Sequence, residues 1–501
     1  MKKSISIIVI AVLLINLKLF ASFDFNDNCK KAYIAVSSLD FNLAKEILSK
    51  EKKLQPENLI PYYIENSIDF LKVAIGEKEE DFQNFKQRRK ERIERFNRDD
   101  KSSPYNRYCL ADIYLQSAFL RARFKEYIPA AFEINKAYRL LEENNRLYHD
   151  FLPNNKSLGL IHALIGTIPD EYKWANNFLS IRGSVSQGIS ELTTLLLSTT
   201  KSEEYEHLQI ETLIILTFVE VNLENDKESI LKLYDIYQKP LVMELVEKSP
   251  LLTYSYASIA AHLGMNDKAI EILINQKPVE SSFKYSYLDL MLGEAKLFRL
   301  DKDANIYLMK YINEFQGKNY KKAAFQKLAW YYLINKDDEK YKSTIAKALK
   351  YGEASFDSDK QAENEAKSNT IPNVILLKAR LLFDGGYYYP ALNVLVQNTP
   401  SSFINDKKDA LEYTYRFGRI YHKLEKYDKA ISYYKLTLKE GKEFTYYFAA
   451  NSALQLGLIY EINNNYDEAE KYFLQCLKLK PDEYKNGIHQ KAKAGLNRIG
   501  K

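Results

Sequence analysis

Two stretches near the C-terminus of the chain repeat one pattern of small and aromatic residues. In each, a glycine is followed by a tyrosine 3 residues later and by an alanine 12 residues later, and another aromatic residue comes 4 residues after the alanine. The positions are Gly418, Tyr421, Ala430 and Tyr434 in one copy, and Gly457, Tyr460, Ala469 and Phe473 in the other. A small residue lets two helices approach closely, and an aromatic ring fills the space beside it. The pattern therefore predicts two consecutive helix-turn-helix pairs.

Weaker copies of this pattern extend toward the N-terminus. Some keep the spacing, one is a residue shorter, and one places a tyrosine where a small residue is expected. These copies are Ala257 with Ala269 and Leu273, Gly293 with Ala304 and Leu308, Ala329 with Tyr341, and Ala379 with Ala391 and Leu395. Near the N-terminus, similar sets are Ala32 with Ala44 and Leu48, and Ala118 with Ala130 and Ile134. We expect six helix pairs between about Leu251 and Tyr484, stacked so that neighbours bury each other's apolar faces.

The C-terminal copies resemble the tetratricopeptide repeat, and the second is the closer match. It holds the sequence Leu456-Gly457 followed by Tyr460, Ala469, Phe473, Cys476 and Pro481. The copies are 39 residues apart, whereas the family repeats every 34 or so, which predicts a longer linking turn. The resemblance implies an all-α fold, a helix-turn-helix α-solenoid, and a role in binding other proteins. Scarce glycine (17) and proline (13) in 501 residues also favour helix.

The middle of the chain departs from the repeat. Residues 158–192 are apolar and marked by glycine, and they contain two helix-start patterns, at Thr167-Ile168-Pro169-Asp170 and at Ser184-Val185-Ser186-Gln187. We expect a short buried helix first, then a helix that holds Trp174 and Phe178, and then a third from about Val185. A largely apolar helix should follow from Leu208 to Leu223. The polar stretch from Asp357 to Asn369 predicts an exposed turn.

This middle block resembles a motif of the tetratricopeptide repeat 39 and inclusion-body clearance proteins. The shared features are Gly159, the apolar run to Ile165, Pro169, Trp174, Gly183 and Gly188 before Leu192. In that family the motif links N-terminal helices to a C-terminal repeat array, and the resemblance implies the same layout here. It brings no catalytic residues with it.

The N-terminus predicts a secretory signal peptide over residues 1–22. Lys2 and Lys3 precede an apolar run from Ile5 to Leu17, and small residues follow. The run has about 13 residues, fewer than the roughly 20 that a helix needs to cross a bilayer. An uncleaved anchor is the alternative. The rest divides into an N-terminal helical repeat region (23–150), a central helical block (151–245) and a C-terminal repeat array (246–501).

Charge and cysteine content exclude several classes of protein. The net charge is +6, and loss of Lys2, Lys3 and Lys18 would leave +3, which does not predict a nucleic-acid partner. The three cysteines, Cys29, Cys109 and Cys476, are not spaced as a disulfide framework. We expect no transmembrane span after removal of the leader, and at most a peripheral association with the envelope.

The sequence offers no recognisable catalytic or metal-binding pattern. No two of the six histidines share a helix face, no cysteine pair suits zinc, and no glycine-rich loop ends as a phosphate-binding loop. We therefore expect neither an enzyme nor a cofactor. Two alternatives stay open: a glycan- or peptide-capture protein that uses aromatic clusters such as Tyr387-Tyr388-Tyr389, and an enzyme with its site in residues 158–192, where the titratable residues are His162, Asp170, Glu171 and Lys173.

In repeats of this type the first helix of each pair lines a concave groove. The resemblance implies groove positions at Glu412, Tyr415, Arg419, His422 and Lys423 in the first clear copy, and at Asn451, Leu454, Leu458, Glu461 and Ile462 in the second. The first set suits a peptide with acidic and apolar groups. Terminal repeats that only cap the array are the alternative. The sequence thus predicts a non-catalytic scaffold for protein or peptide partners, exported to the periplasm or outer membrane of a bacterium.

Overall fold

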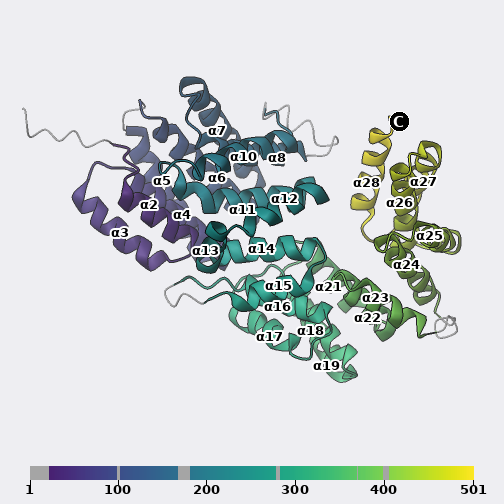
Figure 1. Ribbon diagram of the computed structural model, residues 1–501. Coiled ribbons are helices and arrows are strands. Elements are labelled where there is room, and N and C mark those ends of the chain that lie inside the picture. The colour runs from purple at the N-terminus through teal and green to yellow at the C-terminus, as the bar shows by residue number, and fades with distance from the viewer. Residues whose placement is uncertain are drawn as a thin grey trace, which may run out of the picture. The chain divides into compact units, whose positions relative to one another are not determined.

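Every regular element in the described part of the chain is a helix (Figure 1). The computed structural model describes residues 22–98, 102–167, 181–277, 282–368, 370–398 and 406–500. The all-α prediction is confirmed within these ranges. The predicted signal peptide, apart from its last residue, lies outside the described residues. In the part described, we find no helix with the length and apolar character needed to cross a membrane.

The chain divides into two compact units. The N-terminal unit takes the chain up to Leu263 together with residues 271–288 and 314–317. The C-terminal unit takes residues 264–270, 289–313 and the chain from Lys318 onward. Two of the predicted regions, 23–150 and 151–245, thus fall within one unit.

The N-terminal unit begins with antiparallel helix pairs. Its helices are α2 (Asp27–Ser37), α3 (Phe41–Leu54), α4 (Ile60–Gly76), α5 (Glu79–Arg98), α6 (Pro104–Arg123), α7 (Tyr127–Leu147), α8 (Asn154–Gly166), α10 (Val185–Thr199), α11 (Gln209–Val219), α12 (Lys227–Tyr237), α13 (Pro240–Lys248) and α14 (Pro250–His262), with short turns η2 (Glu206–Leu208) and η3 (Glu220–Glu224). The expected small residues Ala32 and Ala44 are buried between α2 and α3, and Ala118 and Ala130 between α6 and α7. Both predicted pairs are therefore confirmed.

Helices α8 and α10 of the central block cross at two glycines. A Cβ on Gly188 would lie 2.3 Å from the carbonyl oxygen of Gly159, and a Cβ on Gly159 would lie 2.8 Å from Leu192. Only glycine permits this approach. The Ser184 side chain accepts a hydrogen bond from the Gln187 amide at 3.1 Å and so caps α10, as its sequence predicts. The helix expected around Trp174 and Phe178 lies outside the described residues.

The remaining helices follow the expected order, and five of the six expected pairs pack together. After α15 (Asn266–Asn275), these pairs are α16 (Tyr287–Phe298) with α17 (Ala304–Glu314), α18 (Lys321–Ile334) with α19 (Asp338–Ile345), α22 (Val374–Asp384) with α23 (Tyr388–Val396), α24 (Lys407–Lys423) with α25 (Tyr427–Gly441), and α26 (Tyr447–Ile462) with α27 (Tyr466–Lys478). A short helix α20 (Lys347–Lys350) follows α19, and α28 (Lys485–Arg498) ends the series. Helix α28 packs on both α26 and α27.

The exposed turn predicted from Asp357 is wrong, because the segment forms helix α21 (Asp357–Ser368). Its Asp359 is fully buried, and its carboxylate accepts hydrogen bonds from the backbone amides of Tyr320 at 2.8 Å and Ala323 at 3.0 Å. These are among the unpaired amides at the start of α18. Asp359 therefore caps helix α18, which begins more than thirty residues earlier in the chain. Ala362, one turn later in α21, is also buried.

Candidate protein-interaction surface

The two glycines of the C-terminal pattern set the helix spacing in the last two pairs. A Cβ on Gly418 in α24 would lie 2.7 Å from the ring of Tyr434 in α25. A Cβ on Gly457 in α26 would lie 2.5 Å from the ring of Phe473 in α27. Each aromatic ring is fully buried and occupies the place of the missing side chain. The repeat pattern is therefore present in the packing as well as in the sequence.

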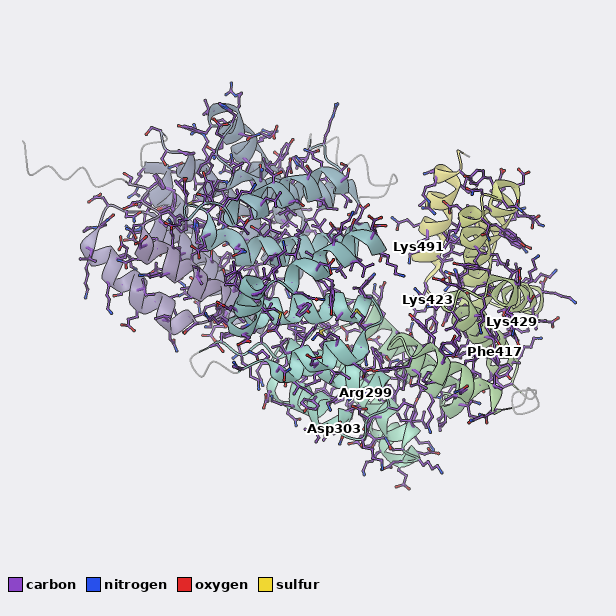
Figure 2. The ribbon with its side chains drawn as sticks, in the orientation of Figure 1. Arg299, Asp303, Phe417, Lys423, Lys429 and Lys491 are labelled. Carbon is purple, nitrogen blue, oxygen red and sulfur yellow. The ribbon has the colours of Figure 1, made fainter. Side chains whose placement is uncertain are left out.

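The first helices of successive pairs form one side of the C-terminal unit. Helix α24 packs against both α22 and α26, and α26 packs against α28. Figure 2 shows Lys423 at the end of α24 and Lys491 on α28 on the same side of these helices, and Lys429 on α25 on the opposite side. We call the side formed by α18, α22, α24, α26 and α28 the inner face.

Two of the predicted groove residues are core residues, which corrects the sequence prediction. Tyr415 is only 1% exposed, and Leu454 is only 2% exposed. The Tyr415 ring lies 5.3 Å from that of Phe448, and its hydroxyl accepts hydrogen bonds from Arg419 Nη1 at 3.0 Å and Asn451 Nδ2 at 2.7 Å. Neighbouring first helices pack too tightly for these two side chains to reach a partner.

The other predicted residues of α24 lie at or near the surface. Glu412 is half-buried and pairs with Arg416 one turn later. The Arg419 guanidinium lies over the Phe383 ring, with Cζ 4.5 Å from the ring centroid. Burial, together with the charges of Lys423 and Arg419, lowers the pKa of His422 to about 4, so this imidazole is neutral at pH 7. Lys423 is exposed.

The predicted residues of α26 divide between an apolar strip and an ion pair. Leu458 is half-buried and Ile462, one turn later, is 64% exposed. The Glu461 carboxylate accepts hydrogen bonds from both Nε and Nη2 of Arg498 in α28, at 2.6 and 2.8 Å. Glu461 therefore holds α28 against α26, and Leu458 and Ile462 form the apolar part of the α26 surface.

Sequence analysis missed a row of alternating cations and rings along the first helices of the C-terminal unit, in which both rings, Trp330 and Phe383, are buried. Lys327 Nζ lies 4.2 Å from the centroid of the Trp330 ring, and Arg380 Cζ lies 4.8 Å from that of the same ring. With Arg419 over Phe383, the row continues from α18 through α22 to α24. We call these five residues the cation–ring row.

A sequence signal for this row exists. Trp330, Arg380 and Arg419 each follow directly after the small residue of a first helix, namely Ala329, Ala379 and Gly418. The residue after the small position therefore belongs to the cation–ring row in each of these helices, with Trp330 buried and the two arginines partly exposed. Burial opposes the charge of Arg380 and of Arg419, yet neighbouring groups, including Asp384 in both cases, raise the pKa of each guanidinium above its ordinary value. Both are charged at any physiological pH.

The structure gives little support to the two alternative sites, the tyrosine cluster and residues 158–192. Tyr387 and Tyr388 are half-buried, the Tyr387 hydroxyl bonds to Asp267 at 2.9 Å, and only Tyr389 of this cluster is mainly exposed, at 60%. His162 is buried and its Nδ1 lies 2.8 Å from a carboxylate oxygen of Glu191. Asp170, Glu171 and Lys173 lie outside the described residues. Within the described ranges, no cluster of His, Cys, Asp and Glu could hold a metal ion.

Comparison with known proteins agrees with the C-terminal packing. A family model described as tetratricopeptide repeat matches residues 409–482. No curated protein matches the chain. Among solved structures, a similar chain occurs in the "crystal structure of APC/C hetero-tetramer Cut9-Hcn1", with 13% sequence identity, a TM-score of 0.23, and coverage of 94% of this chain and 95% of that chain. At this TM-score nothing about that complex transfers to the present chain.

The narrower resemblance of residues 158–192 to the tetratricopeptide repeat 39 family stays a prediction. The broader one is confirmed for residues 409–482, because these matched residues contain both glycine-and-aromatic pairs. Residues 409–482 of the chain therefore form tetratricopeptide repeats.

Proposed function

We propose that the protein is an exported scaffold that binds an acidic and apolar segment of a partner protein on the inner face of its C-terminal unit. The single observation that carries this proposal is the cation–ring row. Each ring lies against a cation. Arg380 pairs with Asp384, and Arg419 Nη1 donates to Tyr415, yet both guanidinium groups keep a positive charge that attracts carboxylates. The tetratricopeptide repeat fold, which serves to bind proteins, supports it.

The apolar strip of α26 supplies the second half of the surface. Leu458 and Ile462 lie one helical turn apart, so one apolar side chain of a partner can contact both. An acidic segment with an apolar residue nearby would then bind across α22, α24 and α26. Because the helix array is held by its own core, little ordering would accompany binding.

Two substitutions test the surface. We expect Arg380→Gln with Arg419→Gln, and separately Ile462→Asp, to reduce capture of a partner from the envelope fraction by at least about tenfold. Ile462 is mainly exposed, so its substitution should leave the fold intact. The control is Lys426→Gln with Lys429→Gln, which removes the same charge from exposed positions at the start of α25.

The proposal would fail if both inner-face variants, shown by circular dichroism to be folded, kept the wild-type partners. It would also fail if a partner bound through a basic segment. A synthetic peptide copied from the partner's acidic region then gives the affinity directly, and the inner-face variants should weaken it by a similar factor.

Export is the second part of the proposal, and the sequence of residues 1–22 supports it. The basic Lys2-Lys3 pair, the short apolar run and the small residues after it are the parts of a cleaved leader. N-terminal sequencing of the chain recovered from the envelope of its bacterial host is the test. We expect a start close to Ser22, and a chain that still carries Ile5 to Leu17 would contradict cleavage.

A further inference from the structure

The N-terminal unit contains a cavity of about 180 Å³ that the proposed function does not use. It lies among α2, α4, α6, α8, α11 and α14. Most of its lining is apolar, including Leu115, Leu160, Ile214 and Ile215. An engineered apolar cavity of about 150 Å³ is large enough to take up benzene. A ligand about the size of one substituted benzene ring therefore fits this cavity.

One wall of the cavity is a buried polar network built on Lys156. Its side chain is 1% exposed, and its ammonium lies 3.1 Å from Asp112 Oδ2 and 3.0 Å from Glu211 Oε2. The hydroxyls of Tyr33 and Tyr63 lie 3.2 and 3.4 Å away. An ammonium group has three protons, and four acceptors already surround it. Lys156 therefore has no proton left for an anionic ligand.

The remaining donors on this wall are also used within the protein. The Gln116 amide nitrogen donates to Ser67 Oγ and to Asp112 Oδ2, both at 3.1 Å. The Ser157 hydroxyl donates to Asp112 Oδ1 at 2.8 Å, which leaves both oxygens of that carboxylate with donors. The donors of Lys156, Gln116 and Ser157 are therefore all used within the protein.

Glu211 supplies a carboxylate oxygen that can accept a hydrogen bond from a ligand. Its Oε2 accepts from Lys156 and from Tyr33, whereas its Oε1 has no hydrogen-bond partner among the described residues. Its side chain is 30% exposed and lines the cavity, as do the half-buried Ile214 and Ile215 on the same helix. Two carboxyl groups face one ammonium here, so the charged lining favours a cation over a neutral donor.

We propose that this cavity binds a small amine with a compact apolar body. The protonated amine would donate to Glu211 Oε1, and the apolar body would fill the space beside Leu115 and Ile215. Phe119, 36% exposed, places part of the apolar lining at the surface.

The test compares four probes of similar size on the full chain by isothermal titration calorimetry and ligand-detected NMR. These are benzylamine, benzyl alcohol, toluene and benzoate. We expect benzylamine to bind at least about tenfold more tightly than toluene, because a hydrogen bond to a charged group contributes about 1.5 to 3 kcal/mol. Benzyl alcohol should lie between them, and benzoate should not bind.

Two variants assign the site. Glu211→Gln keeps an oxygen acceptor for Lys156 and Tyr33, and it should abolish the preference of the cavity for benzylamine over toluene. Ile215→Trp should fill the cavity and abolish binding of both. The matched control is Glu228→Gln, since Glu228 is an exposed carboxylate on α12 that pairs with Lys232 outside the cavity.

Three results would overturn the proposal. One is equal affinity for benzylamine and toluene in the wild-type protein. Another is tighter binding of benzoate than of benzylamine. The third is an absence of amine binding at millimolar concentration by a wild-type chain whose circular dichroism and thermal unfolding show it to be folded. If Ile215→Trp does not fold, the comparison of Glu211→Gln with Glu228→Gln still decides where the amine binds.

Discussion

His207 shows how burial of one titratable side chain makes the stability of the N-terminal unit depend on pH. It lies in η2, is 1% exposed, and stacks on Phe25 with ring centroids 4.2 Å apart. Its Nδ1 has no hydrogen-bond partner among the described residues. Burial, with smaller effects of Lys30 and Lys156, lowers its pKa from 6.5 to about 3. The folded chain therefore excludes a proton that the unfolded chain binds.

This difference fixes the sign of the pH dependence. Above pH 6.5 the imidazole of His207 is neutral in both the folded and the unfolded chain, so it does not lower the free energy of unfolding. As the pH falls from 6.5 toward about 3, the imidazole gains a proton in the unfolded chain only, so the contribution of His207 to the free energy of unfolding is lost. Glu220 acts in the opposite direction, because burial and the nearby Glu224 raise its pKa to about 7. The contribution of His207 must therefore be measured by comparing variants, because the pH dependence of wild-type stability also contains that of Glu220.

We expect His207→Phe to reduce the loss of unfolding free energy between pH 6.5 and 5 by about 1 to 2 kcal/mol, because one proton contributes roughly 1.4 kcal/mol per pH unit. A phenyl ring keeps the stack on Phe25 and removes the titrating group. Urea unfolding at the two pH values gives the measurement. His149→Gln is the control, since the side chain of His149 is 83% exposed. Equal pH dependence of wild type and His207→Phe would refute the assignment.

At the scale of the element, Gly457 controls how closely α26 and α27 approach. The Phe473 ring is enclosed by two glycines, since a Cβ on Gly495 of α28 would lie 2.4 Å from the same ring. The ring therefore cannot move away from a new methyl group at either side. We expect Gly457→Ala to destabilise the C-terminal unit by about 1 to 3 kcal/mol, measured by urea unfolding.

Gly487 provides the matched control for this substitution. It lies in α28, and no atom is within 4 Å of the Cβ that it lacks. Because alanine favours helix over glycine, Gly487→Ala should raise the stability by up to about 1 kcal/mol. If both substitutions changed stability in the same direction, close helix approach would not be the reason that the pattern requires Gly457.

The elements that sequence reasoning predicted correctly are those with a local signal. The glycine and alanine positions identified both helices of a pair, because the residue that permits close approach and the ring that fills the space lie within one repeat. Helix α21 had no such signal, since its role depends on Asp359 meeting the start of α18. Tyr415 and Leu454 were misplaced for a related reason: repeat register predicts which way a side chain faces but not how tightly neighbouring first helices pack.

The same limit applies to the Lys156 network, the site in the N-terminal unit that sequence reasoning missed. Asp112, Lys156 and Glu211 come from three helices and share no spacing that a single repeat would reveal. Each would be read as an ordinary surface charge, and only the packing of α6, α8 and α11 brings them together. The repeat pattern therefore indicates which helix faces which side, whereas side chains brought together between repeats leave no pattern in the sequence.

At the scale of the whole molecule, each compact unit has its own buried thiols. Cys29 and Cys109 are fully buried in the N-terminal unit, and Cys476 is fully buried in the C-terminal unit. Burial raises the pKa of all three, that of Cys476 to about 12, and only the thiolate reacts with alkylating agents. Labelling of each cysteine therefore reports the opening of its own unit.

We expect all three thiols of the native chain to react with iodoacetamide at least about a hundredfold more slowly than in concentrated urea. Along a urea series, Cys29 and Cys109 should become reactive together, and Cys476 at a different concentration, because each unit is stabilised by a separate core. Site-resolved mass spectrometry of the wild-type chain measures all three without substitution of a buried residue. A common midpoint would mean that the two units unfold as one. Separate midpoints for Cys29 and Cys109 would instead mean that the N-terminal unit is not a single cooperative body.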